Sequence, residues 1–403
     1  MHIPTQHRDL LESAMKRFDS SFFAYDLDML SKHLDHMNQC LGDNSGVKLW
    51  YACKANPLSA ILKQFRHNNF GVDISAQGEL EQVLNAGFTP REVISTGPSK
   101  ARKFMRSLLT YGVDTIVLEG HRQAYWLNEI ASEMNLRPKV LLRVQLSWKE
   151  GKSVLGGDEI TAFGLEPDAW KELDLDRCKN LDIQGFHCFQ WGNIMDPNRL
   201  YKIWETITEA MLKLGEELGV HVSILDLGGG LGVPYEFGTP ELDFKEVANN
   251  LIKIKAKYNI EKIWMEIGRY AVAGCGMYFT QVIDQKKVRG RELLIADGGI
   301  NHISRPALTD ESFPCEIFRQ SNSSTHEFHV HGPLCTALDK LGVFELPEDT
   351  APGDWLVFHQ TGAYGFTEAM PFFLCHNLPG EVTLSQGKLE VLRSINTSAS
   401  WLV

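Results

Sequence analysis

Eight apolar segments alternate with helix-like segments between residues 45 and 270. Among the latter, RLYKIWETITEAMLKLGEELG (199–219) has apolar residues at a spacing near 3.6 and ends on a glycine, which is typical of a helix C-cap. Strands that alternate with helices form parallel sheets, so this pattern favours a (β/α)8 barrel, although an open sheet of eight strands shares it. The candidate strands are LWYACKAN (49–56), GVDISA (71–76), EVISTG (92–97), DTIVLEG (114–120), KVLLRV (139–144), IQGFHCFQ (183–190), ILDLGGG (224–230) and KIWMEIG (262–268).

The pattern changes after residue 270. Segments such as GMYFTQVIDQKKV (276–288) and THEFHVHG (325–332) are short, often alternate in polarity and are bounded by turn residues, which indicates a β-rich region. We therefore predict an α/β chain with a barrel over residues 21–270 and a β-rich domain over residues 271–403. FFAYDLD (22–28) also has the character of a strand, so residues 1–28 are candidates to add a strand to the second sheet.

Composition excludes several classes of partner. The net charge of −11 argues against nucleic acid and anionic membranes, and no apolar run is long enough to span a bilayer. The amino terminus lacks the apolar core of a secretion signal. The eight cysteines are scattered without a CxxC pair, so we expect reduced thiols in the cytoplasm and neither a disulfide framework nor a metal site.

Unusual polar residues and glycines gather where the predicted strands end. The carboxyl ends of barrel strands carry the active site in enzymes of this architecture, so their common position suggests one site. They are Lys54, Asp73, Ser75, His187, Gly228, Gly229, Gly230, Glu266, Gly268 and Arg269.

Each of these features has a simple structural explanation when taken alone. Lys54 could be a strand-end lysine that reaches water, the GGGLG run a tight turn, and EIGR (266–269) the site of a salt bridge. Together they supply what pyridoxal phosphate needs: an amine for a Schiff base, backbone amides and a guanidinium for the phosphate, and a carboxylate for the pyridinium nitrogen.

Nine ordered segments resemble the fold-type III pyridoxal phosphate decarboxylases, the family of diaminopimelate, ornithine and arginine decarboxylases. This resemblance implies a (β/α)8 TIM barrel of the alanine-racemase type, a carboxy-terminal β domain, and a head-to-tail homodimer. Its active sites would lie between the barrel of one subunit and the β domain of the other. The segments are YACKAN (51–56), VDISAQGEL (72–80), ISTGPSK (94–100), GFHC (185–188), DLGGGLGVPY (226–235), EIGRY (266–270), DGGINHISRP (297–306), GPLCTALD (332–339) and GAYGF (362–366).

The resemblance also implies roles for individual residues. Lys54 matches the Schiff-base lysine, and Cys335 matches the partner-subunit cysteine that reprotonates the product, although a cysteine is more often a small core residue. Arg305 resembles an arginine that binds a substrate carboxylate. The cofactor-binding positions are Asp73 near the cofactor, His187, Gly228, Gly229 and Gly230 in the phosphate loop, Glu266 at the pyridine nitrogen, Gly268 and Arg269 beside the phosphate, and Tyr364 reaching the phosphate or substrate.

Two departures from the family pattern bear on the site. Where the family has a histidine stacked on the cofactor ring, this chain has Phe189 by simple register, so either Phe189 or His187 is expected to cover the ring. Family members that act on basic substrates have an acid directly after the cysteine, whereas this chain has Thr336, which brings no charge to a distal ammonium.

The segments GPLCTALDKLG (332–342) and MPFFLCHNLPGEV (370–382) together resemble a divergent branch of the family. This branch includes decarboxylases of siderophore assembly and one acting on a carrier-bound glutamyl group. The predicted function is the decarboxylation of a small-molecule amino acid centre joined to a carboxylate-rich, citryl-type group, with the configuration at Cα left open. The alternatives are a diaminopimelate or basic amino acid decarboxylase, an amino acid racemase on the same fold, and a non-catalytic regulator that binds the cofactor.

Overall fold

The structure is a computed structural model that describes residue 3 and residues 5–113, 115–147 and 160–402. The chain forms two compact units. The first comprises residues 33–233 and 241–271, and the second comprises residues 1–32, 234–240 and 272–403. Among the described helices, none is long and apolar enough to cross a membrane.

The first unit is a closed barrel of eight parallel strands. Each strand pairs with the next, and the last strand pairs in parallel with the first, which confirms the (β/α)8 prediction over the open sheet. The strands are β2 (Val47–Ala52), β3 (Gly71–Ile74), β4 (Val93–Ser95), β5 (Thr115–Leu118), β6 (Lys139–Arg143), β7 (Asp182–His187), β8 (Ile224–Asp226) and β9 (Lys262–Ile267).

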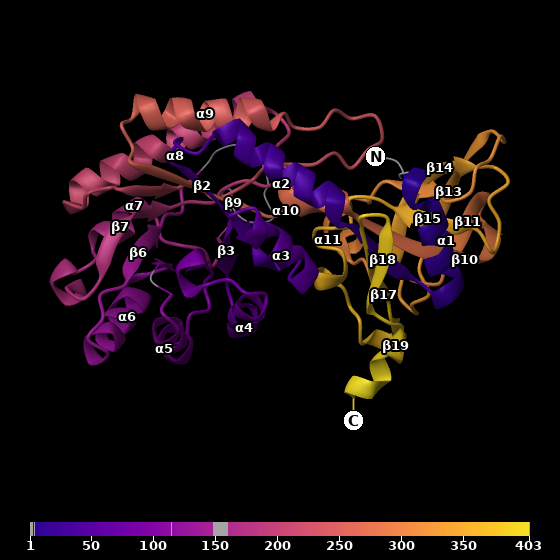
Figure 1. Ribbon diagram of the computed structural model, residues 1–403, viewed down its shortest axis with the longest axis horizontal. Helices are drawn as coiled ribbons and strands as arrows, with labels where there is room; N and C mark the ends of the chain where they lie inside the picture. Colours follow the sequence, from indigo (N-terminus) through magenta and orange to yellow (C-terminus); the bar gives the residue numbers. More distant parts are fainter. Residues whose placement is uncertain (1–2, 4, 114, 148–159, 403) are drawn as a thin grey trace. The chain divides into compact units, whose positions relative to one another are not determined.

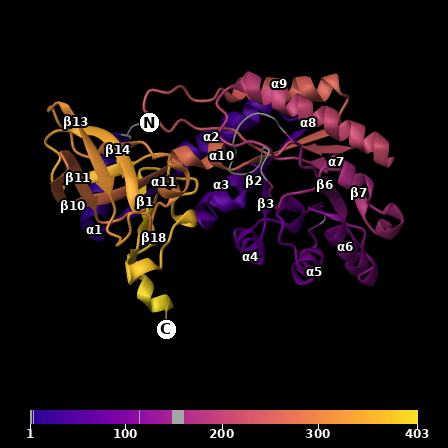
Figure 2. The ribbon, with the colours of Figure 1, turned by 180° about the vertical axis from the view of Figure 1, so that it is seen from behind.

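Helices surround the barrel, as Figures 1 and 2 show from opposite sides. The longest, α8 (Pro197–Leu218), begins where the Asp196 side chain accepts a hydrogen bond from Asn198 N and ends at the left-handed Gly219 (φ 67°), the predicted C-cap. The others are α3 (Ser59–His67), α4 (Gln77–Asn85), α5 (Arg102–Tyr111), α6 (His121–Glu133), α7 (Pro167–Lys171) and α9 (Phe244–Lys257). Along the chain, α2 (Leu27–Leu41) and α10 (Arg269–Val272) run from one unit into the other.

Apolar side chains from six strands fill the barrel. Trp50 and Trp264 lie with ring centroids 4.8 Å apart and pack with Ile94, Val117, Leu141 and Ile224. This packing closes the interior, so a ligand site has room only where the strands end.

The second unit contains a nine-stranded sheet. The early strand β1 (Phe22–Asp26) pairs antiparallel with β10 (Gly276–Val288) and parallel with β17 (Gly380–Ser385), so this segment belongs to the second sheet. Helix α1 (Arg8–Phe18) packs Leu11 and Ala14 on the sheet's core. The remaining elements are β11 (Arg291–Ala296), α11 (Arg305–Thr309), β12 (Cys315–Ile317), β13 (Thr325–His331), β14 (Lys340–Pro347), β15 (Trp355–Phe358) and β18 (Lys388–Arg393), together with the separate pair β16 (Asn377–Leu378) and β19 (Asn396–Thr397).

Candidate active site

Lys54 lies in a tight turn directly after β2. The turn is closed by a hydrogen bond from Asn56 N to Cys53 O (3.1 Å) and by one from Tyr51 Oη to Asn56 O (2.9 Å). Cys53 and Ala55 are buried, whereas Lys54 is exposed. Burial raises the pKa of Asp73 and of Glu79, and the positive charge of Lys54 offsets part of that rise. The same charge helps to lower the pKa of Glu266, so the Lys54 amine lies near all three carboxyl groups.

Three buried carboxyl groups occupy the ends of β3, β8 and β9. Asp73 Oδ2 accepts a hydrogen bond from Thr96 Oγ1 (3.0 Å), and Asp226 Oδ1 accepts one from Gly228 N (2.9 Å). Burial, followed by the negative charge of Glu266, raises the pKa of both Asp73 and Asp226 well above the ordinary value. These two acids are therefore easily protonated in the chain by itself.

Glu266 differs from its two neighbours because it has a histidine partner. Burial alone would raise the pKa of Glu266, but the charge of His187 and a hydrogen bond from it outweigh that effect and lower the pKa. His187 Nε2 lies 3.1 Å from Glu266 Oε1, deep in the barrel. Glu266 is thus the carboxylate of the cluster that stays ionised, as a partner for a pyridinium nitrogen must.

One possible ligand atom from each of three side chains lies within 4.8 Å of the other two: His187, Asp226 and Glu266. Histidine and carboxylate groups so arranged are also the residue types that bind metal ions. Polar atoms around this cluster lack hydrogen-bond partners among the described residues: Asp73 Oδ1, Asp226 Oδ2 and His187 Nδ1. A ligand with polar ring substituents would satisfy such buried atoms.

The glycines after β8 form a crowded loop. A Cβ atom at Gly229 would lie 2.1 Å from the carbonyl oxygen of Glu266, and one at Gly230 would lie 2.4 Å from that of Trp191. Gly228 (φ 63°) and Gly230 (φ 98°) also have left-handed backbones. Only glycine fits these positions, and a glycine run of this kind, directly after a strand, lets the backbone approach an anion such as phosphate closely.

Phe189 and His187 lie in different places. A Cβ at Gly228 would lie 2.8 Å from the Phe189 side chain, so the Phe189 ring packs against the glycine loop. The His187 ring is instead turned to Glu266. Half-buried Gly268 and Arg269 follow β9, so that Arg269 opens α10.

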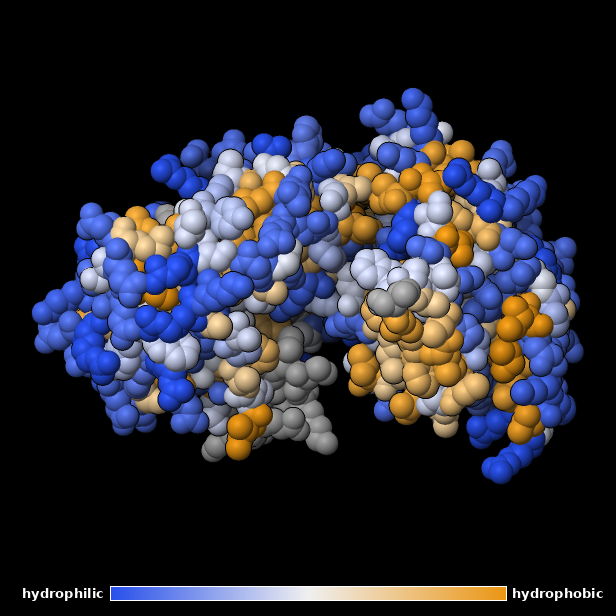
Figure 3. All heavy atoms as spheres, turned by 90° about the horizontal axis from the view of Figure 1, so that it is seen from below, coloured by the Kyte–Doolittle hydropathy of each residue, from blue (hydrophilic) through white to orange (hydrophobic). Residues whose placement is uncertain are grey.

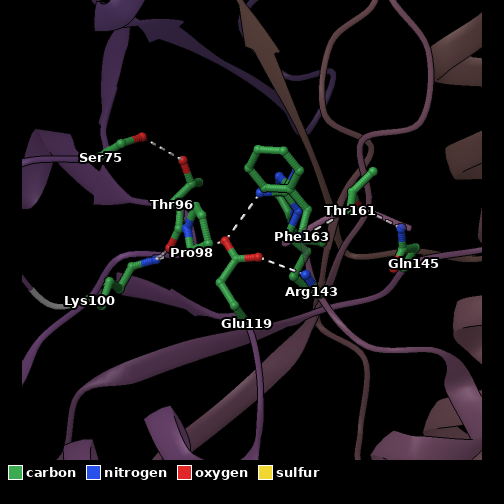
Figure 4. A network of polar contacts seen from close by, with 12 residues as sticks. Ser75, Thr96, Pro98, Lys100, Glu119, Arg143, Gln145, Thr161 and Phe163 are labelled. Atoms are coloured by element: carbon green, nitrogen blue, oxygen red, sulfur yellow. Dashed lines mark hydrogen bonds and ion pairs between the residues drawn. The ribbon is translucent and has the colours of Figure 1, made fainter. Parts of the chain in front are cut away.

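A buried ion network lies at the ends of β5 and β6 (Figure 4). Its residues were not among the site residues predicted from the sequence. Glu119 Oε1 lies 3.1 Å from Arg143 Nη1 and 3.9 Å from Lys100 Nζ, while Glu119 Oε2 accepts a hydrogen bond from Gly164 N (2.8 Å). Lys100 also donates to Gly97 O (2.5 Å), and its burial lowers its pKa to about 8. Glu119 and Arg143 each follow an apolar run, which was a usable signal in the sequence, whereas Lys100 follows the turn residues Gly97, Pro98 and Ser99.

The remaining predicted residues belong to the second unit. Cys335 has an exposed thiol in the loop between β13 and β14, and the Thr336 hydroxyl accepts a hydrogen bond from Leu338 N (3.3 Å). Tyr364 has a left-handed backbone (φ 53°), an uncommon conformation for a tyrosine that is often found at functional sites.

Arg305 opens α11 and is buried. Its guanidinium lies 4.7 Å from the centroid of the Tyr235 ring and forms an ion pair with Glu311, while Nε has no hydrogen-bond partner among the described residues.

The barrel residues fit pyridoxal phosphate in chemical type. An amine lies near an ionised carboxylate, a glycine loop offers backbone amides, and an arginine follows directly after the Glu266 strand. The unsatisfied buried atoms require a polar partner.

A family model described as the pyridoxal binding domain of pyridoxal-dependent decarboxylases matches residues 27–273. Among curated proteins, the L-glutamyl-(BtrI acyl-carrier protein) decarboxylase of Niallia circulans is 25% identical and covers 95% of this chain and 93% of its own. The 2-((L-alanin-3-ylcarbamoyl)methyl)-2-hydroxybutanedioate decarboxylase of Staphylococcus aureus is 28% identical, and the match covers 91% of this chain and 94% of that protein. The diaminopimelate decarboxylase of Campylobacter jejuni is 25% identical, covering 94% of each.

Solved structures share the fold. The diaminopimelate decarboxylase of Helicobacter pylori, complexed with L-lysine, superposes with a TM-score of 0.87 at 23% identity, covering 97% of this chain and 98% of that one.

Proposed function

Because the chain belongs to the family of pyridoxal-dependent decarboxylases, and is therefore a carboxy-lyase that uses pyridoxal 5'-phosphate, we propose that it decarboxylates an amino acid centre whose far end carries carboxylates. The bound cofactor supplies an electron sink that stabilises negative charge at Cα when the carboxyl group leaves. The observation that carries the substrate assignment is Thr336, an uncharged residue turned onto its own loop beside Cys335.

Lys54 is the residue that we assign to covalent attachment of the cofactor through Nζ. The loop of Gly228, Gly229 and Gly230, together with Gly268, Arg269 and Tyr364, would hold the phosphate, and Glu266 would hold the pyridine nitrogen. Asp73 lies near the Lys54 amine and can exchange a proton with it because its own pKa is raised.

Phe189 is the better candidate to cover the ring of the cofactor. Its side chain packs on the glycine loop, which would hold the phosphate, while the His187 ring is engaged with Glu266. In this assignment His187 keeps Glu266 ionised instead of stacking on the ring.

Cys335 is assigned to proton donation at Cα after carbon dioxide has left. Its thiol is exposed in a loop of the second unit, so it can approach a substrate held by another subunit. The Cys335 thiol would supply the proton from Sγ that forms the new Cα–H bond of the product, and Lys54 Nζ would hold the cofactor between turnovers.

The far end of the substrate would be recognised through charge. Arg305 offers a buried guanidinium to a carboxylate, and Thr336 offers no charge to an ammonium. The relative from Staphylococcus aureus acts on an alanine group joined through a carbamoyl link to a hydroxybutanedioate, which is a substrate of this kind.

A carbon dioxide release screen tests this assignment. It should compare amides between a diamino acid and citrate with meso-diaminopimelate, ornithine, lysine, arginine and glutamate. We expect turnover of the carboxylate-rich amides; turnover of meso-diaminopimelate alone would instead support the second candidate, which the relative from Campylobacter jejuni and the presence of Arg305 favour. Chiral analysis of recovered substrate separates either reaction from racemisation.

We also propose that the enzyme is a homodimer with shared active sites, located in the cytoplasm. Six apolar side chains in the carboxy-terminal segment are exposed, and Figure 3 shows apolar residues gathered on this part of the second unit. Exposed apolar patches of this kind mark protein interfaces. The six are Met370, Phe372, Phe373, Leu374, Trp401 and Leu402.

Ile300 links the exposed apolar patch to the loop that carries Cys335. Met370 N donates to Ile300 O (3.2 Å), and Ile300 N donates to Asp339 at the end of the loop that carries Cys335. A subunit that covered the patch would therefore approach Cys335 as well.

A further inference from the structure

The loop of residues 332–339, which joins β13 to β14, is held by its last residue. Gly332 N donates to Asp339 O (3.2 Å), so the backbone closes the two ends of the loop. Inside it, Thr336 N donates to Leu334 O (2.8 Å) and Asp339 N donates to Thr336 O (3.3 Å). Cys335 lies between these two turns, with its thiol exposed.

The Asp339 side chain ties this loop to a second one. Its Oδ2 accepts a hydrogen bond from Leu334 N (2.7 Å), the amide directly before Cys335. Its Oδ1 accepts one from Ile300 N (2.8 Å), in the segment DGGIN (297–301) that follows β11. Asp339 is only 1% exposed, so neither amide has water as an easy substitute.

Two glycines make room for the carboxylate. A Cβ atom at Gly299 would lie 2.2 Å from Asp339 Oδ1, and one at Gly332 would lie 2.4 Å from Oδ2. Each would also lie within 2.6 Å of the other glycine's Cα. The two loops therefore approach each other with a carboxylate between them, an arrangement that no larger residue at either glycine would permit.

Charges around the carboxylate act in opposite directions. Burial raises the pKa of Asp339 above its ordinary value, and the amides of Ile300 and Leu334 and the charges of His331 and His376 offset part of that rise. The two amide donors require an acceptor on each oxygen, which the ionised form supplies best.

We propose that Asp339 is a positioning residue for Cys335, which holds the thiol where it can deliver a proton to Cα. Among the described residues, the hydrogen bonds to the Asp339 carboxylate come from the backbone amides of Ile300 and Leu334, so Asp339 acts through the loop and not on the substrate. This inference rests on the proposed role of Cys335 and adds the residue that orients it.

A substrate-independent experiment measures the loop directly. In the wild-type holoenzyme, hydrogen exchange should be slow at Leu334 and Ile300. In Asp339→Asn, which keeps the volume and replaces one acceptor with an amide donor, exchange in both loops should accelerate at least tenfold, while β13 and β14 stay unchanged. The matched control is Asp28→Asn, since Asp28 accepts a hydrogen bond from Gln386 N (2.7 Å) in a different turn of the same unit.

A second readout separates positioning from general stability. With the best substrate from the release screen, wild-type enzyme should give one amine per carbon dioxide. Cys335→Ala and Asp339→Asn should both form less amine per carbon dioxide, because protonation fails at Cα and abortive transamination follows. The double variant should be no worse than Cys335→Ala, and Asp28→Asn should keep the wild-type ratio.

The outcomes distinguish the two claims. An unchanged ratio in Cys335→Ala would overturn the proposed role of the cysteine. The role of Asp339 would be overturned if the ratio of amine to carbon dioxide changed in Cys335→Ala but not in Asp339→Asn. It would also be overturned if hydrogen exchange at Leu334 were the same in Asp339→Asn as in the wild type.

Discussion

Neutralising Glu119 should destabilise the barrel in a way that depends on pH. The carboxylate lies between Arg143 and Lys100, and the side-chain exposures are 4%, 8% and 0% for Glu119, Arg143 and Lys100, so solvent screens little of the interaction. In Glu119→Gln, two buried cations lose their shared partner. Breaking a buried ion pair in this way costs about 3–5 kcal/mol, so we expect a loss of about 3 kcal/mol at pH 7.

The pH dependence follows from Lys100. Burial lowers its pKa to about 8 from the ordinary 10.5, so between these values the unfolded chain carries a proton that the folded chain has released. The unfolded state binds more protons there, and wild-type stability therefore rises with pH across this interval. Above pH 8 Lys100 is largely neutral, and Arg143 is the remaining cation that Glu119 neutralises. The loss of folding free energy in Glu119→Gln should therefore fall by about 1 kcal/mol between pH 7 and pH 9.5.

Urea unfolding followed by tryptophan fluorescence provides the assay, because Trp50, Trp170, Trp204 and Trp264 are buried in the barrel unit. The control is Glu129→Gln, which removes an exposed ion pair with Arg102 in the same unit and should cost less than about 1 kcal/mol at either pH. It would refute the reasoning if Glu119→Gln lowered the free energy of unfolding by no more than the control does, or if its loss of stability grew as the pH rises.

Three further predictions concern the cofactor and the assembly. Borohydride reduction of the wild-type holoenzyme should leave the cofactor mass on the peptide containing Lys54, and Lys54→Ala should lose it; a label on another peptide would contradict the assignment. Gly229→Ala should weaken pyridoxal phosphate binding to the apoprotein about tenfold, measured by fluorescence titration, because the new Cβ would lie 2.1 Å from the carbonyl oxygen of Glu266. Gly78→Ala, with nothing within 4 Å, is its control and should bind as wild type does. Mixing inactive Lys54→Ala with Cys335→Ala, which forms little amine, should restore about a quarter of wild-type amine formation if subunits exchange and share sites; no recovery after confirmed exchange would count against shared sites.

Several site residues could be predicted because barrel geometry is regular. Strand ends in a parallel barrel lie along one edge, so Lys54, Asp73 and Glu266 could be placed there from periodicity alone. The same rule extends to Glu119 and Arg143, which also close apolar runs. Their pairing could not be predicted, because it depends on which side chain faces the barrel interior and on the register between β5 and β6.

The choice between His187 and Phe189 shows a similar limit of sequence reasoning. The two residues are two positions apart, and a shift of register would exchange their places. The structure separates them by their neighbours, since His187 lies against Glu266 and Phe189 against the glycine loop.

The sequence by itself determined the alternation of eight strands with helices, the β-rich second region, the chemical groups at the strand ends and the likeness to a family. These depend on periodicity and on local order along the chain, whereas the closure of the eight strands into a barrel was decided by the pairing of β2 with β9. Only the tertiary structure decided which carboxyl group stays ionised, since Asp73, Asp226 and Glu266 are all buried and only Glu266 contacts His187. It also decided that Asp339 joins two loops far apart in sequence. Burial and long-range contacts set proton affinity and loop position, and neither is written in the order of neighbouring residues.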